Sequence, residues 1–337
     1  MMLSKEGKDI RLSVLDLAPV VSGSTAATTF ANTVELARHT EKLGYRRYWL
    51  AEHHNMPGIA SAATSILIGH VAAATSSIRV GSGGIMLPNH SPLVIAEQFG
   101  TLESLFPGRI DLGLGRAPGT DQMTAQALRR GGRGDGQDFP ELLAALRAYF
   151  NPPLTEEYRS VRAFPGEGLD IPIWLLGSSG FSARLSAELG LPFAFASHFS
   201  PENTIPALTL YRDQFTPSTS LQKPNAMVGL NIIAANTDQE AELLASSMKQ
   251  SFLNLIRNKP TMLQPPNEHI EQQMSQYERT ILEKQLSMSI IGGPETVRTK
   301  LQSLIDQTQA DELMINTQIY DQQARLRSFE IVADVGM

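Results

Sequence analysis

Cysteine is absent from the 337 residues of this chain, which excludes disulfide bonds, iron–sulfur clusters, thiolate metal sites and cysteine nucleophiles. Runs of basic residues are absent too, and 28 lysines and arginines against 34 acidic residues leave a net charge of −6. A chain of this charge repels phosphate backbones and anionic lipid surfaces. We therefore expect no nucleic-acid partner and no electrostatic attachment to a membrane.

A long hydrophobic run is also lacking. The most apolar stretch, residues 60–74, contains polar residues such as His70 and is too short to cross a bilayer. Residues 1–11 alternate polar and charged side chains and lack the apolar segment of a secretory signal. These absences predict a cytoplasmic protein that does not span a membrane.

The chain does contain an alternation of short β-rich segments with helical patterns, which predicts βα units and a parallel sheet. The expected strands are 11–15, 47–50, 78–80, 110–114, 171–176, 192–196, 226–233 and 312–316. The expected helices are 26–43, 60–75, 181–189, 203–215, 237–258 and 321–335, with others beginning near residues 91, 138 and 294. The pattern favours an α/β fold, a TIM (β/α)8 barrel in one domain, 1–337. The alternative is an open doubly wound sheet.

Local patterns add detail to these helices. The 60–75 helix is apolar on nearly all sides, which predicts that it is buried. Asp138 and Glu141 have the spacing of a capping box. Residues 237–290 interrupt the alternation and predict an insertion between the seventh strand and its returning helix. Within the insertion, the Pro- and Gln-rich stretch 259–285 has little periodicity, and we expect it to shape a substrate pocket together with the βα loops.

Catalytic residues of a barrel lie where its strands end. Glu52, His53 and His54 follow the second strand. Neighbouring side chains of an extended segment point to opposite faces, so the two histidines do not readily bind one metal ion, and we predict no metal site. One histidine facing the barrel mouth, with an ordinary pKa of about 6.5, would exchange protons near neutral pH. The alternative is a loop of solvated histidines.

Glycine ends the third and fourth strands. Gly83 and Gly84 favour either a flat ring lying against the backbone or a plain bulge. Gly115 and Arg116 follow the fourth strand, but Pro118 stands where a dinucleotide fingerprint needs a third glycine. Arg116 is therefore a candidate phosphate ligand, or else the partner of a salt bridge at the rim.

A second candidate anion site follows the fifth strand. Backbone N–H groups at the start of a helix combine there with the hydroxyls of Ser178, Ser179 and Ser182. Ordinary helix capping by Ser179 is the alternative. His198 and Gln318 end later strands and are expected to line the same mouth. The glycine-rich segment 131–136 follows no strand and predicts a loop or lid.

Taken together, Glu52-His53-His54 and the segments 81–88, 108–116 and 175–179 resemble the bacterial-luciferase-like flavin-dependent monooxygenase family. The resemblance covers residues 12–335, and the single-chain bacterial members are the most similar. It implies a TIM barrel that binds FMN at its mouth and forms a homodimer. In this family His53 would be the catalytic histidine, with Glu52 and His54 as its neighbours.

The resemblance also implies a set of cofactor-binding residues. They are Gly83, Gly84, Gly115, Arg116, Leu176, Ser178, Ser179 and Ser182. The Gly83–Gly84 pair would be joined by a cis peptide under the flavin ring, and the arginine and serines would hold the flavin phosphate. Gly115 stands in the place of a reactive cysteine of luciferase, and Ser178 in the place of an acidic residue. Chemistry specific to luciferase is therefore not expected.

The implied reaction uses reduced FMN and O2 to oxygenate a small organic substrate. A separate NAD(P)H:flavin reductase would reduce the flavin, since the chain lacks a nicotinamide fingerprint. One alternative is F420-dependent hydride transfer on the same scaffold, and another is a flavin-binding protein without turnover. A cofactor-free isomerase or aldolase would need a lysine or a pair of carboxylates at the strand ends, which the sequence lacks.

Overall fold

The computed structural model describes residues 4–5, 8–129, 136–151 and 161–336. Eight parallel strands form a closed ring in the order of the sequence, because the sixth of them pairs with the seventh and the eighth with the first. They are β3 (Arg11–Asp16), β4 (Arg47–Leu50), β5 (Arg79–Ser82), β7 (Ile110–Gly115), β8 (Ile173–Gly177), β9 (Phe193–Ala196), β10 (Ala226–Ala234) and β12 (Glu312–Asn316). The prediction of a TIM barrel is confirmed, and the open sheet is excluded.

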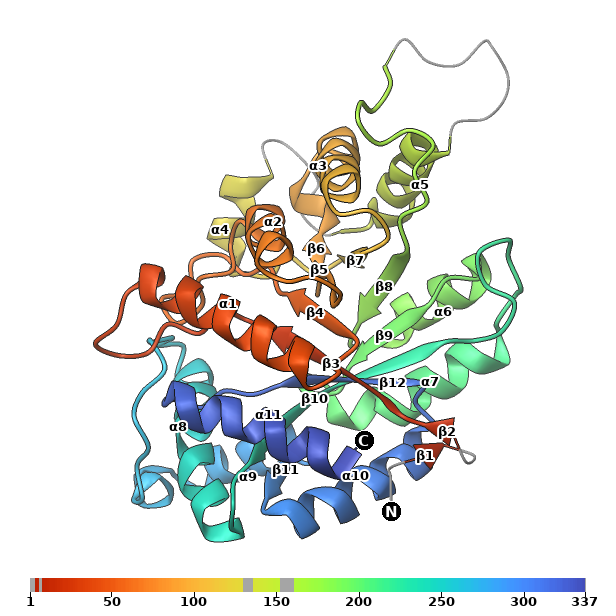
Figure 1. The fold of residues 1–337 in the computed structure, drawn as a ribbon. Coiled ribbons are helices and arrows are strands. Elements are labelled where there is room, and N and C mark those ends of the chain that lie inside the picture. The colour runs from red at the N-terminus through yellow and green to blue at the C-terminus, as the bar shows by residue number, and fades with distance from the viewer. Residues whose placement is uncertain (1–3, 6–7, 130–135, 152–160, 337) are drawn as a thin grey trace.

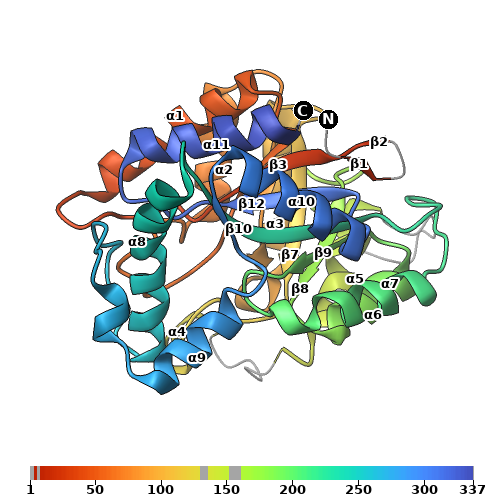
Figure 2. The same cartoon turned by 90° about the horizontal axis from the view of Figure 1, so that it is seen from below.

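Helices surround the strands, as Figure 2 shows from below. The outer ring consists of α1 (Ala26–Lys42), α2 (Thr64–Ala74), α3 (Pro92–Leu105), α5 (Phe139–Phe150), α6 (Gly180–Leu189), α7 (Thr204–Asp213), α10 (Pro294–Thr308) and α11 (Gln322–Gly336). Their ends follow local sequence signals. Thr25 caps α1 by accepting a hydrogen bond from the Thr28 amide, and Gly44 follows that helix with a φ of 82°.

Short elements join the ring at both ends of the barrel. Between the strands lie β6 (Ile85–Met86), η1 (Leu87–Asn89), α4 (Gln122–Leu128) and η2 (Pro201–Asn203), and a hairpin of β1 (Ser4–Lys5) and β2 (Lys8–Asp9) precedes the barrel. Residues 131–135 of the predicted glycine-rich loop lie outside the described ranges. No helix in the described ranges has the length and apolar character needed to cross a bilayer.

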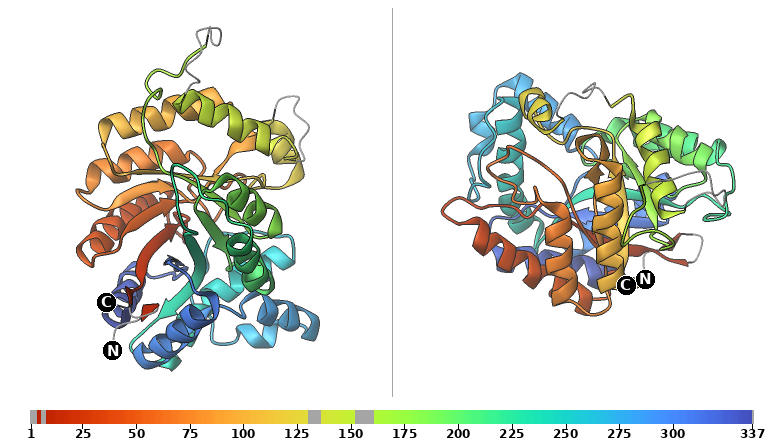
Figure 3. Two further views of the ribbon diagram at one scale, coloured as in Figure 1. Left: turned by 90° about the vertical axis from the view of Figure 1, so that its right-hand side faces the viewer. Right: turned by 90° about the horizontal axis from the view of Figure 1, so that it is seen from above.

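Two predictions about individual helices are wrong. The helix after β4 begins at Thr64 rather than near residue 60, and it is not buried on all sides, because Ile66 is 72% exposed. The carboxylate of Asp138 makes no capping hydrogen bond to α5, although the helix does begin at Phe139. In Figure 3, helices α2 and α3, drawn in orange, lie on the outside of the barrel.

The insertion lies between β10 and α10, where the sequence predicts it. It contains α8 (Asp238–Ile256), η3 (Ile270–Gln273), α9 (Gln276–Gln285) and β11 (Ile290–Gly292). Figure 1 places α8 and α9 together at the lower left of the molecule. The view that 259–285 has little regular structure is therefore wrong, since α9 opens with a complete capping box between Ser275 and Glu278. Strand β11 pairs with the end of β10 outside the ring.

The interior of the barrel is layered. At the amino-terminal ends of the strands, Arg47 is paired with Asp111 at 2.6 Å and with Glu312 at 2.9 Å, and all three side chains are buried. Above this charged layer, Trp49 packs edge-on against Trp174 with ring centroids 5.6 Å apart. The Trp49 indole N–H donates to Asp111 at 3.1 Å, which fixes the tryptophan from below. The barrel is therefore filled up to the carboxyl ends of its strands, where it opens.

Candidate functional site

A cavity of about 230 Å³ lies at the carboxyl ends of the barrel strands. Its wall contains most of the predicted site residues: His53, Gly83, Gly84, Gly115, Arg116, Leu176, Ser178, Ser179, Ser182 and His198. These residues follow different strands, and only closure of the barrel brings them together. The structure therefore brings most of the predicted residues together around one cavity at this face of the barrel.

The floor of the cavity is apolar. It is formed by Leu15, Trp49, Leu176, Met227 and Met314. Most of these side chains belong to the cluster inside the barrel and are buried, so the floor is rigidly packed from below. A floor of this kind suits a planar aromatic ring, because it offers dispersion contacts without polar groups that would stay unpaired.

The glycines at this end of the barrel are required by their neighbours. A Cβ atom on Gly83 would lie 2.7 Å from the Leu15 side chain, and one on Gly84 would lie 2.8 Å from the Gly113 carbonyl oxygen. A Cβ atom on Gly115 would lie 2.7 Å from the Met86 sulfur. The Gly83–Gly84 peptide bond is cis, as the resemblance predicts. The backbone is therefore bare where it lines the cavity.

Arg116 stands at the polar end of the cavity. Its guanidinium group lies over the Phe181 ring, 4.1 Å from the centroid, and forms no ion pair with any described residue. A salt bridge at the rim, the alternative role for this residue, is not observed. The side chain is half-buried, so its position is constrained while its charge remains available. Such an arginine is suited to bind an anion through its planar fork of donors.

The amino terminus of α6 lies at the same end. Ser179 occupies the cap position, with an extended φ of −149°, but its side chain makes no capping hydrogen bond. Ordinary capping by Ser179 is therefore not observed. Ser178 and Ser179 are exposed, whereas Ser182 is buried against Gly177. Free hydroxyls beside unpaired N–H groups at the start of a helix complete a site with the donors that a phosphate group needs.

His53 also lines the cavity. Its Nδ1 atom is buried and has no hydrogen-bond partner in the described part of the chain. Burial lowers the pKa of His53 from 6.5 to about 4, although the neighbouring Glu52 carboxylate opposes this shift. The expectation of an ordinary pKa near 6.5 is therefore wrong. At neutral pH His53 is a neutral imidazole with a free nitrogen.

His198 is the second imidazole of the cavity. It is buried, which lowers its pKa to about 4, and its Nδ1 atom also lacks a partner among the described residues. A Cβ atom on Gly229 would lie 2.9 Å from that nitrogen, so the glycine makes room for the ring. Phe199 stacks beside it with ring centroids 4.3 Å apart. The cavity thus contains two neutral imidazoles near its apolar floor.

Glu52 and His54 do not line the cavity. The His54 Nε2 atom lies 3.0 Å from the Glu52 carboxylate, and the His90 Nε2 atom lies 2.9 Å from the same group. The Met86 amide also donates to Glu52, at 3.0 Å. Burial raises the pKa of Glu52, but the hydrogen bonds from His54, His90 and Met86 outweigh it and lower that pKa to about 2.

We call Glu52, His54 and His90 the carboxylate cluster. It joins the loop after β4 to the segment after β6, and the backbone of His54 also bonds Gly119 and Thr120 in the loop after β7. Neither side chain hydrogen-bonds the His53 ring in the described part of the chain. Their hydrogen bonds instead connect the loops around the cavity. His90 was missed, and only its place just beyond the 81–88 motif points to it.

Gln318 lines a different cavity from the one expected. This insertion pocket, of about 100 Å³, adjoins the first cavity, and His53 and Phe199 line both. Its apolar wall consists of Leu17, Pro19, Met56, Ile59, Phe252, Leu255, Pro260 and Leu263, with Gly58, Ser251, Thr261 and Gln318 between them. The sequence predicts that the insertion shapes a pocket, but no local pattern identifies Phe199 or Phe252.

The chain matches other proteins along most of its length. A family model described as luciferase-like monooxygenase matches residues 10–312. A protein of Escherichia coli strain K12 named luciferase-like monooxygenase is 56% identical over 328 residues, which are 97% of each chain. The N-acetyl-S-alkylcysteine monooxygenase of Bacillus subtilis strain 168 is 39% identical over 237 residues, which are 69% of this chain and 70% of that protein.

Solved structures share the fold. The crystal structure of apo-MsnO8 has a TM-score of 0.89 and 36% identity, over 97% of this chain and 98% of the other. An oxygenating constituent of 3,6-diketocamphane monooxygenase from Pseudomonas putida, in complex with FMN, has a TM-score of 0.71 and 18% identity, over 98% of both chains. An F420-dependent secondary alcohol dehydrogenase has a TM-score of 0.71 and 11% identity, over 98% of this chain and 100% of the other. At 18% and 11% identity the likeness concerns the fold alone.

Proposed function

Since the chain belongs to the luciferase-like monooxygenase family, we propose that it is an FMN-dependent monooxygenase that oxygenates a small organic substrate with reduced flavin and O2. One observation carries this proposal. A single cavity joins an apolar floor to an unpaired arginine beside the start of α6. FMN has the same division, with a planar ring at one end and a phosphate at the other.

The polar end would hold the phosphate. Arg116 supplies a fixed cation, and Ser178 and Ser179 supply hydroxyl donors next to the free N–H groups of α6. The helix terminus adds a partial positive charge. Together these donors are sufficient to bind an anion, and no lysine or metal ion is needed.

The apolar end would hold the ring. Leu176 and Met314 offer apolar contacts, and the bare backbone of Gly83 and Gly84 accepts a flat group close to the chain. The rings of His53 and His198 also line the cavity, and their Nδ1 atoms have no hydrogen-bond partner among the described residues. A buried polar atom without a partner costs free energy, so a ligand that satisfies it is favoured.

When bound, reduced FMN supplies the electrons that activate O2 for transfer of one oxygen atom. The protein residues contribute the surroundings of that reaction. The packed floor excludes water, and the neutral His53 ring can accept or donate a hydrogen bond at Nδ1. Because its pKa is about 4, His53 would act at neutral pH by holding a proton in place rather than as a charged acid.

We also propose a partner protein, a cellular location and an oligomeric state. A separate NAD(P)H:flavin reductase would supply reduced FMN, and the protein would work in the cytoplasm. The protein would also form a homodimer, as the resemblance implies. The size of the substrate follows from the cavities, and a relative named for an N-acetyl-S-alkylcysteine also has a small organic substrate.

The proposal is tested by titrating the protein with FMN and with F420. We expect FMN to bind more tightly than F420. The double variant Arg116→Ala/Ser179→Ala should weaken FMN binding by about 1.5–3 kcal/mol or more, the scale of a charge-assisted hydrogen bond. Arg184→Ala is the matched control, since Arg184 is exposed on the same helix and does not line the cavity. Unchanged FMN affinity in the double variant, or tighter binding of F420, would contradict the proposal.

Turnover is tested separately. Reduced FMN, O2 and an extract of small metabolites are incubated with the protein, and the products are profiled for compounds that gain one oxygen atom. Labelling with ¹⁸O₂ identifies the origin of that atom. The expected result is an enzyme-dependent product that carries the label. Flavin binding with no such product would favour a flavin-binding protein without turnover.

A further inference from the structure

The insertion pocket contains the strongest unassigned site of the described chain. We propose that it binds a short alkyl group of the substrate, about four carbon atoms long, and that Phe252 and Leu255 on α8 limit the length of that group. This inference rests on the proposed function, because it places the alkyl group next to the cavity assigned to FMN. It adds a substrate class and two residues that determine specificity.

The chemistry of the wall favours an alkyl group. Among the residues that line the pocket there is no lysine, arginine, aspartate or glutamate. The two hydroxyls of the wall already have partners, since Ser251 donates to the Ser247 carbonyl and Thr261 accepts from the Asn254 amide. A charged or strongly polar ligand would lose its hydration without compensation there, whereas an alkyl group gains free energy by leaving water.

Two polar side chains of the pocket wall differ from its hydroxyls. The Gln318 amide forms no hydrogen bond with the described residues, and the His53 ring, whose Nδ1 atom is unpaired there, lines the same pocket. The rest of the lining comes mainly from apolar side chains such as Phe252 and Leu263. A ligand with an alkyl tail and one hydrogen-bonding head therefore matches this distribution better than a uniformly apolar one.

The volume sets the length of the tail. Benzene, with six carbon atoms, occupies an apolar protein cavity of about 150 Å³. The insertion pocket measures about 100 Å³, which corresponds in proportion to about four carbon atoms. Methylene groups beyond that length would lie outside the pocket, where they gain no further contact with its apolar wall.

The position of the pocket connects it to the reaction. His53 and Phe199 line both cavities, so a group bound in the pocket lies directly beside the cavity assigned to FMN. Phe199 is held from the insertion, because the Gln285 side chain at the end of α9 donates to the carbonyl oxygens of His198 and Phe199, both at 3.0 Å. The insertion thus forms one wall of the pocket and fixes the residue that divides it from the larger cavity.

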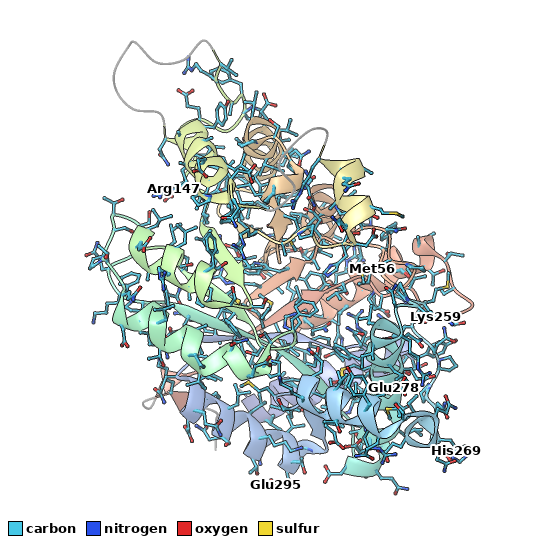
Figure 4. All side chains as sticks on the ribbon, turned by 180° about the vertical axis from the view of Figure 1, so that it is seen from behind. Met56, Arg147, Lys259, His269, Glu278 and Glu295 are labelled. Carbon is cyan, nitrogen blue, oxygen red and sulfur yellow. The ribbon has the colours of Figure 1, made fainter. Side chains whose placement is uncertain are left out.

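The other wall is fixed against the barrel. The Leu263 N–H donates to the Val20 carbonyl oxygen at 2.9 Å, and the Leu263 carbonyl oxygen accepts from the Ser22 N–H at 2.8 Å. The insertion also approaches the loop after β4 so closely that a Cβ atom on Gly58 would lie 2.5 Å from the Thr261 carbonyl oxygen. Figure 4 shows Met56 of this loop and Lys259 of the insertion at the same edge of the molecule. This part of the pocket wall is therefore fixed by backbone contacts that do not depend on a ligand.

The test measures binding of the straight-chain alcohols from methanol to heptanol, by methyl NMR on the full chain with and without FMN. In the wild-type protein we expect affinity to rise about fourfold for each methylene group up to butanol and to stay level beyond it. Signals of Met56 and Leu263 should shift. A series without dependence on chain length, or one that leaves these signals unchanged, would overturn the proposal.

Variants of Leu255 sharpen the test, because this residue is 44% exposed and its replacement should not impair folding. Leu255→Trp should fill the pocket and weaken butanol binding by at least tenfold, while Leu255→Ala should extend the rise in affinity beyond butanol. Leu243→Trp is the matched control, since Leu243 lies on the same helix, is 37% exposed and does not line the pocket. A butanol affinity in Leu255→Trp equal to that of the wild type, or an equal loss in Leu243→Trp, would overturn the assignment.

The FMN titration of the same variants separates this inference from the proposed function. Normal FMN affinity together with alcohol binding that is insensitive to Leu255 would overturn the pocket and leave the proposed function standing. A dependence on Leu255 in a protein that does not bind FMN would support an alkyl site but overturn its link to a flavin enzyme. The expected result is normal FMN affinity in all Leu255 variants and an altered limit on chain length.

Discussion

His53 and His54 are adjacent in the sequence but lie in opposite environments. His53 lines the cavity, and its Nδ1 atom is buried without a partner. His54 points away from the cavity and is paired with Glu52 at 3.0 Å. The His53 N–H donates to the Ser61 carbonyl, whereas the His54 N–H donates to the Gly119 carbonyl. One short segment therefore serves both the cavity and the loops behind it.

The same contrast holds for the two regions to which these residues belong. In the cavity, Arg116 forms no ion pair and the Nδ1 atoms of the two imidazoles accept or donate no hydrogen bond within the described ranges, so these groups are available to a ligand. In the carboxylate cluster, every oxygen of Glu52 accepts a hydrogen bond from protein groups. Free polar groups indicate where a ligand binds, and satisfied polar groups indicate what holds the site in shape. Substitutions in the two regions should therefore have different effects.

The largest expected effect concerns His53. The variant His53→Ala should reduce formation of oxygenated product by about 10²- to 10⁴-fold, the usual contribution of a group that handles protons. FMN affinity should change little, because Arg116 and α6 carry the phosphate in this account. The measurement compares product formed per O2 consumed, with release of hydrogen peroxide followed in parallel. His54→Ala is the control, and equal losses in both variants would remove the distinction between the two histidines.

A second prediction concerns the pH dependence of stability. His198 has its pKa lowered to about 4 in the folded protein, so protonation favours the unfolded chain. The contribution of neutral His198 to the free energy of unfolding is complete above pH 6.5 and is lost as the pH falls toward 4. The total loss is about 3 kcal/mol. The free energy of unfolding of the wild type, measured with urea, should therefore fall over this pH range. That of the variant His198→Asn should fall less. Identical pH profiles for the two proteins would contradict the assigned burial of this imidazole.

Glu52 should affect the stability of the protein in a lower pH range. Its pKa is lowered to about 2 in the folded protein, so its contribution is complete above pH 4.5 and is lost as the pH falls toward 2. At pH 7, Glu52→Gln should reduce the free energy of unfolding by about 1–3 kcal/mol, since charge-assisted hydrogen bonds to His54 and His90 are weakened. FMN affinity, measured under conditions in which both proteins are fully folded, should remain near that of the wild type. A selective loss of FMN binding without destabilisation would mean that Glu52 belongs to the cofactor site.

The smallest expected effect concerns Gln285. The variant Gln285→Ala removes two hydrogen bonds to the loop of Phe199 and should raise KM by about three- to tenfold, the scale of one ordinary hydrogen bond. The kcat value should change less, because His53 keeps its own environment. Gln285→Glu tests whether an acceptor in this place repels the two carbonyls, and Gln276→Ala on the same helix is the control. A fall in kcat with constant KM would place Gln285 in the catalytic machinery instead.

The fold was predictable because its signals are local. Each barrel strand is a short apolar segment, and the polar or glycine residues after it, such as Gly83 and Arg116, mark the end of the strand. Strand β11 was missed because it has three residues and forms only by pairing with β10. Helix α9 is mostly polar, but the Ser275 and Glu278 spacing could have revealed its start.

The candidate site was predictable in part. The residues that line the cavity follow strand ends, so topology alone brings them together. The lowered pKa of His53 was not predictable, because it arises from burial by residues distant in the sequence. The same holds for the pairing of Glu52 with His90, and for Gln285, whose role depends on contacts between the insertion and the loop after β9.

The central claim is that Arg116 and the start of α6 bind the phosphate of FMN. The most direct test compares the affinities of FMN and riboflavin, which lacks the phosphate, for the wild type and for Arg116→Ala. We expect the wild type to prefer FMN by at least about tenfold, and the variant to lose most of this preference while its riboflavin affinity stays the same. An equal preference for FMN in both proteins, or a parallel loss of affinity for both ligands, would contradict the claim.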